Sequence, residues 1–206
     1  MKHLLNRLLV STAAAVVLLG LGACETTTVA RKTAFDFDPP AQQPKNPSAV
    51  KLKLSTGAQR LYVVEGDTVL LATPVSVGKS VTPTPAGNYT IYLKTEKRRR
   101  VSSPGAGYPM TYWMEFKSAY GLHWGFVKPT PSTHGCVRMP LNSARKVFRM
   151  IPVGTPINIA ASQPWDATIG KSLPTLDDSH LADPPMSYML SPQVFQDANN
   201  GKLWKY

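Results

Sequence analysis

The chain has 206 residues, of which 43% are hydrophobic and 17% charged, and 23 Lys and Arg outnumber 12 Asp and Glu. This composition excludes an intrinsically disordered chain, and two cysteines are too few for a small domain held together by disulfide bonds. The formal net charge of +11 favours an anionic partner, which composition alone leaves open among nucleic acid, phospholipid headgroups and an acidic polymer.

The first 23 residues are typical of a bacterial export signal. Lys2 and Arg7 precede an apolar run over residues 8–21, which is shorter than the roughly 20 residues of a membrane-spanning helix. Residues 21–24 read Leu-Gly-Ala-Cys and resemble the lipobox of lipoproteins, in which the signal is cut before a cysteine that carries diacylglycerol. We therefore predict a signal peptide over residues 1–23 and a lipid anchor on Cys24, since several acyl chains hold a protein on a membrane. An ordinary signal peptide that ends near a cysteine is the alternative.

The residue after Cys24 bears on the destination of the protein. Glu25, rather than Asp, resembles the pattern of lipoproteins sorted to the outer membrane. We predict a periplasmic protein, lipid-anchored to the outer membrane in preference to the inner one, with a mature net charge of +9. No stacking aromatic residues interleave with the Arg98–Arg100 run, and an exported chain rarely meets nucleic acid, so no nucleic-acid partner is expected.

The first elements of the chain are a tether and a series of short strands. Residues 24–47 are rich in Thr, Pro and Gln, which predicts a flexible tether. Val50, Leu52 and Leu54 then alternate with polar residues, the period of a half-buried strand. Further strand patterns cover residues 61–64, 69–77, 89–93 and 155–160. Turns about every 8–12 residues favour a sandwich or barrel.

One amphipathic helix is predicted near the end of this region. Its apolar positions follow the i, i+3, i+4, i+7 pattern, at Ala144, Val147, Phe148 and Ile151. Asn142 or Ser143 is expected to cap the helix start, and Pro152 to end it. Residues 162–206 are rich in Pro, Asp and Ser and are predicted to be a loosely structured extension of unknown role, packed on the domain.

The second cysteine, Cys136, lies in a setting that suits chemistry. A thiol attacks a carbonyl carbon as the thiolate, and its ordinary pKa of about 8.5 leaves little thiolate at neutral pH, so a base must take the proton. His123 precedes Cys136 by 13 residues and is the candidate base. Gly135 allows main-chain N–H groups to approach a developing oxyanion. A lone buried Cys or His is more often structural, but a free thiol in an oxidising compartment is a liability unless it is used.

Residues 132–139, Ser-Thr-His-Gly-Cys-Val-Arg-Met, resemble the active-site motif of the L,D-transpeptidase (YkuD-type) family. Other segments resemble the family in the same order: residues 59–63, 74–79, 82–87, 112–114, 121–123 and 154–157. The resemblance covers roughly residues 48–161. It implies a mainly β, sandwich- or barrel-like L,D-transpeptidase catalytic domain with one or two short helices.

The resemblance also implies site residues. The implied catalytic residues are Cys136 as nucleophile, His123 as general base, and His134 and Gly135, which would shape the nucleophile turn and place main-chain N–H groups near the oxyanion. The implied substrate-binding residues are Arg138, Trp124, Tyr112, Trp113, Ser132 and Thr133. The Trp124 carbonyl would orient His123, and Arg138 would bind a substrate carboxylate. The ten-residue spacer between His123 and His134 and the bulky Trp124 depart from many members and bear on substrate choice.

The implied substrates are peptidoglycan tetrapeptide stems. The thiolate would attack the L,D amide between the third and fourth stem residues and release D-alanine. An amine would then take the acyl group, either from diaminopimelate, giving a 3–3 cross-link, or from a lysine of an outer-membrane lipoprotein. Hydrolysis of the same thioester, as in an L,D-carboxypeptidase or amidase, is one alternative. A non-catalytic peptidoglycan-binding lipoprotein is another.

No cofactor and no metal are expected. His3 lies in the signal peptide, His180 in the C-terminal extension, and no Cys/His spacing suits zinc. If His123 activates Cys136, iodoacetamide should alkylate this thiol faster than a model thiol near pH 7.

Overall fold

The structure, a computed structural model, describes residues 32–100 and 107–203. The predicted signal peptide, Cys24, Glu25 and the start of the predicted tether lie outside these residues. Within the described ranges, no helix combines the length and the apolar character that crossing a membrane requires.

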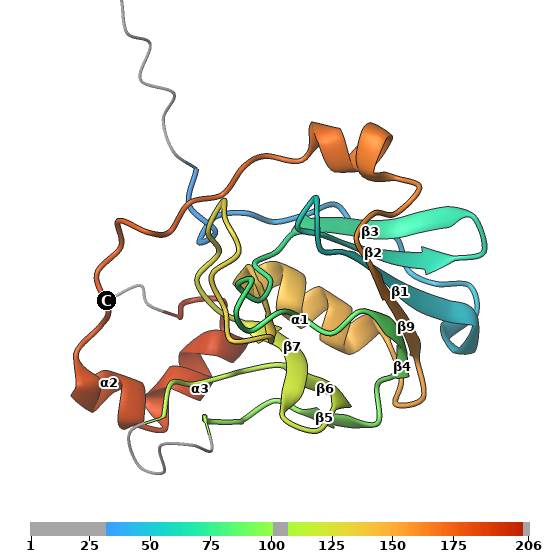
Figure 1. The fold of residues 1–206 in the computed structure, drawn as a ribbon. Helices are drawn as coiled ribbons and strands as arrows, with labels where there is room; N and C mark the ends of the chain where they lie inside the picture. Colours follow the sequence, from blue (N-terminus) through green and yellow to red (C-terminus); the bar gives the residue numbers. More distant parts are fainter. Residues whose placement is uncertain (1–31, 101–106, 204–206) are drawn as a thin grey trace, which may run out of the picture. The chain divides into compact units, whose positions relative to one another are not determined.

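Five strands form the first sheet, in the order β3-β2-β1-β9-β4 (Figure 1). They are β1 (Val50–Ser55), β2 (Arg60–Glu65), β3 (Thr68–Pro74), β4 (Gly87–Thr90) and β9 (Pro156–Ala160). The alternation predicted for β1 is confirmed, because Val50, Leu52 and Leu54 are all buried. Strand β9 pairs in parallel with β1, which joins the end of the predicted domain to its beginning.

Four strands form the second sheet, in the order β5-β6-β7-β8. They are β5 (Leu93–Thr95), β6 (Trp113–Lys117), β7 (Tyr120–Trp124) and β8 (Val137–Met139). The single strand predicted over residues 89–93 is wrong, because β4 pairs with β9 and β5 with β6 in different sheets. Between them, the Ile91 N–H donates to the Thr155 carbonyl. Two sheets with few short helices confirm the predicted mainly β fold class.

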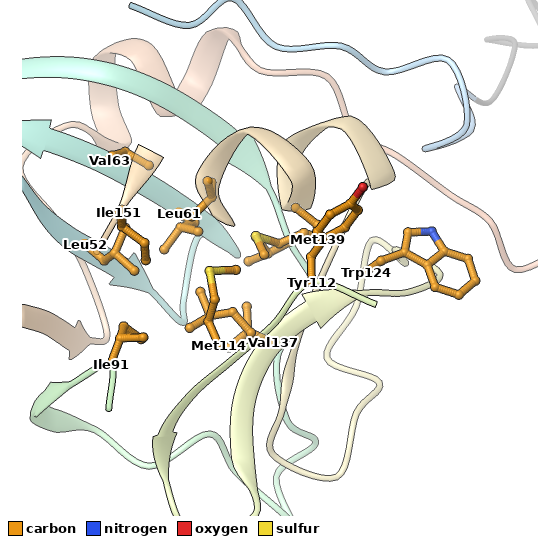
Figure 2. Close-up of a cluster of buried hydrophobic side chains, with 14 of the residues drawn as sticks. Leu52, Leu61, Val63, Ile91, Tyr112, Met114, Trp124, Val137, Met139 and Ile151 are labelled. Atoms are coloured by element: carbon orange, nitrogen blue, oxygen red, sulfur yellow. The ribbon is translucent and has the colours of Figure 1, made fainter. Parts of the chain in front are cut away.

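Helix α1 (Leu141–Met150) packs into the core that both sheets share. Its predicted inner face is confirmed, since Ala144 and Val147 are fully buried. The predicted side-chain cap is wrong: Pro140 precedes the helix, and the Ser143 hydroxyl instead forms a buried hydrogen bond of 2.7 Å with that of Thr73. Figure 2 shows this core, in which side chains of the two sheets meet: Leu52, Leu61 and Val63 from the first, Met114, Trp124, Val137 and Met139 from the second.

The C-terminal extension packs on the domain, as expected, but it is more regular than the loosely structured segment predicted. It contains a π-helical turn, η2 (Asp166–Gly170), and two short helices, α2 (Met186–Leu190) and α3 (Gln193–Asn199). Its buried side chains join the main hydrophobic cluster: Met189, Val194, Ala198 and Leu203. The Tyr62 hydroxyl also donates to Asp166 at 2.8 Å, which fixes η2 against β2.

Residues 32–46, which end in front of the 3-10 turn η1 (Pro47–Ala49), are attached to the domain. Ala34 is buried, and its N–H donates to Asp178 Oδ1 at 2.8 Å, while Asp178 Oδ2 accepts the Val127 N–H at 2.8 Å. A bridge pairs Lys32 in parallel with Leu176. These contacts differ from the flexible tether expected up to residue 47, because part of that segment has apolar side chains that it can bury.

Candidate active site

The turn that carries Cys136 is held by Thr133 and requires a glycine. Gly135 has φ of 112°, and a Cβ there would lie 2.4 Å from Cε1 of Tyr120. The Thr133 hydroxyl accepts the Gly135 N–H at 3.0 Å and donates to the Cys136 carbonyl at 2.6 Å. The Gly135 N–H, one of the two main-chain donors expected near the oxyanion, is therefore used within the turn, and the role expected for the other, the Cys136 N–H, stays a prediction. Thr133, expected to bind substrate, is a buried structural residue of the same turn.

A second segment supports this turn from the side of β3. The N–H groups of Ser132 and Thr133 both donate to the Val77 carbonyl, each at 3.0 Å. The Thr84 hydroxyl accepts the Gly78 N–H and donates to the Gly135 carbonyl, both at 2.9 Å. Residues 76–84 thus fix the nucleophile turn. This support is a physical reason why these residues resemble the family together with the motif that contains Cys136.

His123 is buried and its ring is oriented from two sides. Nδ1 lies 2.5 Å from the Trp124 carbonyl oxygen, as expected from the sequence. Because a carbonyl only accepts hydrogen bonds, Nδ1 carries the proton and Nε2 has the free lone pair. The Trp113 ring lies against the imidazole with 5.6 Å between centroids. His123 therefore presents Nε2 in the form that a general base needs.

The pairing of β7 with β8 puts the two candidate catalytic side chains on one face. His123 pairs with Arg138, and Cys136 precedes Arg138 by two residues. Side chains two residues apart on an extended chain point to the same side, so Cys136, Arg138 and His123 share a face. The Cys136 thiol donates to the Ala119 carbonyl at 3.6 Å, at the turn between β6 and β7.

The surroundings of this pair favour the neutral form of each group. Burial, helped by the charge of Arg138, lowers the pKa of His123 to about 3, against a small opposing effect of its bond to Trp124. Burial likewise raises the pKa of the Cys136 thiol, although a main-chain hydrogen bond from Gly121 and the charge of Arg138 oppose it. These shifts favour a protonated thiol and a neutral imidazole when no substrate is bound.

Arg138, the middle residue of β8, is a positively charged residue next to this pair: it follows Cys136 by two positions and pairs with His123. Its main chain is fixed by two hydrogen bonds with Ser76, of 2.9 and 3.0 Å. Gly125 leaves space for its side chain, since a Cβ at position 125 would lie 2.9 Å from the Arg138 stem. Burial lowers the pKa of the guanidinium, partly offset by Cys136 and Tyr108. A half-buried cation in this position is suited to a carboxylate ligand.

Two other expected substrate residues lie in the core. Tyr112 is fully buried and its hydroxyl donates to Asn199 at 3.0 Å, so the expectation that it binds substrate is wrong. Trp124 is buried against Phe126 and acts through its carbonyl group.

The remaining expected residues differ in exposure. Trp113 is buried and touches His123 rather than solvent. The Ser132 hydroxyl is buried as well. His134 is exposed next to the nucleophile turn, and its expected role stays a prediction.

Glu115, in the middle of β6, was not expected from the sequence. Its carboxylate is buried and accepts hydrogen bonds from Tyr92, Arg98, Trp113 and Ala119. The available signal was a charged residue within the apolar segment Trp113–Phe116. Across residues 32–100 and 107–203, no three His, Cys, Asp or Glu side chains gather as metal ligands would.

The fold and the motif have counterparts among known proteins. Residues 50–159, more than half of the chain, match the L,D-transpeptidase catalytic domain of the YkuD family. The YkuD protein of Bacillus licheniformis is 28% identical over 122 residues, which cover 56% of this chain and 69% of that protein. The YkuD protein of Bacillus subtilis is 29% identical over 113 residues, covering 52% and 64%.

A solved structure shares the fold. An L,D-transpeptidase of Stackebrandtia nassauensis superposes with a TM-score of 0.50 at 23% identity, over 60% of this chain and 60% of that one. The match thus leaves about two fifths of that chain without a counterpart. The match over residues 50–159, with which this likeness in fold agrees, shows that this chain belongs to the YkuD family of L,D-transpeptidase catalytic domains.

Proposed function

We propose that this protein is an L,D-transpeptidase that acts on peptidoglycan stem peptides through a thioester on Cys136. The observation that carries the proposal is the pairing of β7 with β8, which places His123 opposite Arg138, two residues after Cys136, while Nδ1 of His123 is bound to the Trp124 carbonyl and leaves Nε2 to act as a base. A neutral base beside a protonated thiol is the state from which general-base attack begins.

The proposed reaction has two acyl-transfer steps. Cys136 Sγ attacks the carbonyl carbon of the L,D amide between the third and fourth stem residues, and its proton passes to Nε2 of His123. The imidazolium returns this proton to the departing amine of D-alanine, which leaves a thioester. An amine then attacks the thioester, His123 takes its proton, and the thiol is regenerated as the new amide forms. Arg138 binds a carboxylate of the stem and orients the scissile bond.

We also propose the acceptor and the location. A diaminopimelate side chain would give a 3–3 cross-link, and a lysine of an outer-membrane lipoprotein would give a covalent attachment to the wall. The signal sequence, Cys24 and Glu25 support a lipid-anchored periplasmic enzyme at the outer membrane. The basic net charge suits an anionic envelope.

Incubation with tetrapeptide muropeptides tests the transferase reaction. Mass spectrometry should detect released D-alanine and a dimer or exchange product, and Cys136→Ala should abolish both. Tripeptide alone, without any dimer or exchange product, would show that water is the acceptor. A protein that makes neither product and forms no adduct with a carbapenem at Cys136 would be a peptidoglycan-binding lipoprotein instead.

A further inference from the structure

Glu115 carries a charge that the core would not hold without compensation. The residue is 7% exposed, and hydrogen bonds reach both of its carboxylate oxygens. Oε1 accepts from the Tyr92 hydroxyl at 2.9 Å and from the Ala119 N–H at 3.1 Å. Oε2 accepts from the Trp113 indole at 2.9 Å and from Arg98 at 3.1 Å. Four donors offset the cost of removing a carboxylate from water.

One of these bonds leads to the sulfur of Cys136. Ala119 is a non-glycine residue with a positive φ of 64°, in the turn between β6 and β7. Its N–H is bound to Glu115 Oε1, and its carbonyl receives the Cys136 thiol. The bond to Glu115 thus stabilises the unusual conformation that directs the Ala119 carbonyl at the nucleophile.

A second bond leads to the imidazole of His123. The indole N–H of Trp113 fixes that ring against Glu115 Oε2, and the ring lies against His123 at 5.6 Å and 31°. The guanidinium of Arg98 lies over the same ring, 4.4 Å from its centroid, and is paired with the same oxygen. The indole of Trp113 is therefore held at its N–H by Glu115 and on its face by Arg98. His123 packs against a ring that has little freedom to move.

We propose that Glu115 is a positioning residue that sets the placement of Cys136 relative to His123, through Ala119 on one carboxylate oxygen and Trp113 on the other. The inference rests on the proposed function, since it takes Cys136 and His123 to be the reacting pair. None of the four hydrogen bonds of Glu115 goes to the sulfur or to the imidazole. Its negative charge also disfavours the thiolate in the resting state, which agrees with a pair that is neutral until substrate arrives.

A comparison of Trp113→Phe with Tyr92→Phe tests the proposal. Each variant removes one neutral donor from Glu115, but only Trp113 leads to the catalytic pair, whereas Tyr92 is 50% exposed. The probe is acylation by a carbapenem, in which the Cys136 sulfur bonds to the lactam carbonyl carbon, the lactam C–N bond breaks and the thiol proton passes to the nitrogen. The maximal acylation rate should fall at least about tenfold in Trp113→Phe, with the half-saturating concentration unchanged, and stay as in the wild type in Tyr92→Phe.

Glu115→Gln provides a second measurement. Glutamine offers one acceptor oxygen and one donor group, so one of the two connections must break, and the maximal acylation rate should again fall at least about tenfold. Asp166→Asn is the matched control, because Asp166 accepts three hydrogen bonds, from Ser55, Tyr62 and Gln163, beside the other sheet. It should lower the melting temperature and leave the acylation rate unchanged.

The outcomes separate this inference from the proposed function. If the wild type is acylated at Cys136 and Trp113→Phe, Tyr92→Phe and Glu115→Gln all react at the wild-type rate, the positioning role is overturned and the proposed function is not. An equal loss of rate in Asp166→Asn and Glu115→Gln would also overturn it, since loss of stability would then account for the effect. Absence of any wild-type adduct at Cys136 would overturn the proposed function itself.

Discussion

Arg138 lies directly opposite His123 in the parallel pair of β7 and β8. A fixed positive charge therefore stands beside an imidazole that burial already keeps neutral, and the pKa of His123 falls to about 3. The same guanidinium favours the thiolate of Cys136, so Arg138 acts on the two candidate catalytic groups in opposite ways. It eases proton loss from the sulfur and opposes a permanent charge on the base.

Acid should destabilise the fold through His123. Its folded pKa of about 3 lies below the ordinary value of about 6.5, so between these values the unfolded chain binds a proton that the folded chain does not. This stabilisation is complete above the ordinary pKa and is lost as the pH falls toward the folded one. The free energy of unfolding in urea should therefore fall more steeply from pH 7 to pH 4 in the wild type than in His123→Gln. Parallel curves for the two proteins would contradict a neutral buried imidazole.

Alkylation of Cys136 should report a protonated thiol. The sequence led us to expect fast reaction with iodoacetamide, but burial raises the pKa of this thiol and favours the opposite result. In a Cys24→Ser background, which leaves one cysteine, the folded protein should react more slowly near pH 7 than the same protein in urea. The folded rate should also rise about tenfold per pH unit, in step with the thiolate fraction. A high rate that is constant between pH 5 and 8 would instead indicate a thiolate–imidazolium pair.

The nucleophile turn should not tolerate a side chain at position 135. Gly135→Ala adds both a strained φ and a contact of 2.4 Å with Tyr120. Gly154→Ala is the matched control, because Gly154 also has a positive φ, 97°, but nothing lies within 4 Å of an added Cβ. We expect Gly154→Ala to cost about 1–3 kcal/mol of unfolding free energy and Gly135→Ala clearly more, with loss of carbapenem acylation. Equal costs in chemical denaturation would mean that Tyr120 moves freely out of the way.

The C-terminal extension should contribute to stability as a core element. Val194 of α3 is fully buried, whereas Met186 of α2 is 51% exposed. Val194→Ala should lower the free energy of unfolding by about 2 kcal/mol, because it leaves a cavity in the core. Met186→Ala should change it by no more than about 0.5 kcal/mol. Equal and small effects in thermal melts would return residues 162–203 to the status of a loose extension.

Local patterns predicted those elements whose periodicity is complete within a few residues. The alternation of Val50, Leu52 and Leu54 and the helical spacing of Ala144 and Val147 both match buried faces. The pattern over residues 89–93 failed because its two halves pair with strands far apart in the chain, β9 and β6. Strand pairing between distant segments is not encoded in the spacing of neighbouring side chains.

The site residues likewise fall into those that local sequence could predict and those that depend on contacts between distant segments. Cys136 and His123 could be named from the sequence because thiol chemistry needs a base and because the surrounding motif resembles a family. Tyr112 was misplaced since its partner, Asn199, lies 87 positions further along the chain. Glu115 escaped notice because two of its four donors, Tyr92 and Arg98, lie 23 and 17 positions earlier in the chain, and only the fold brings them to this carboxylate.

Asp178 joins the N-terminal end of the described chain to the loop that leads from β7 to the nucleophile turn. Its two oxygens accept the N–H groups of Ala34 and Val127, and the parallel bridge of Lys32 with Leu176 lies next to them. Through Asp178, the N-terminal end of the described residues is thus connected to Val127, which lies in the loop between β7 and β8, nine positions before Cys136. The described chain therefore begins on the same set of hydrogen bonds that fixes the loop between β7 and β8.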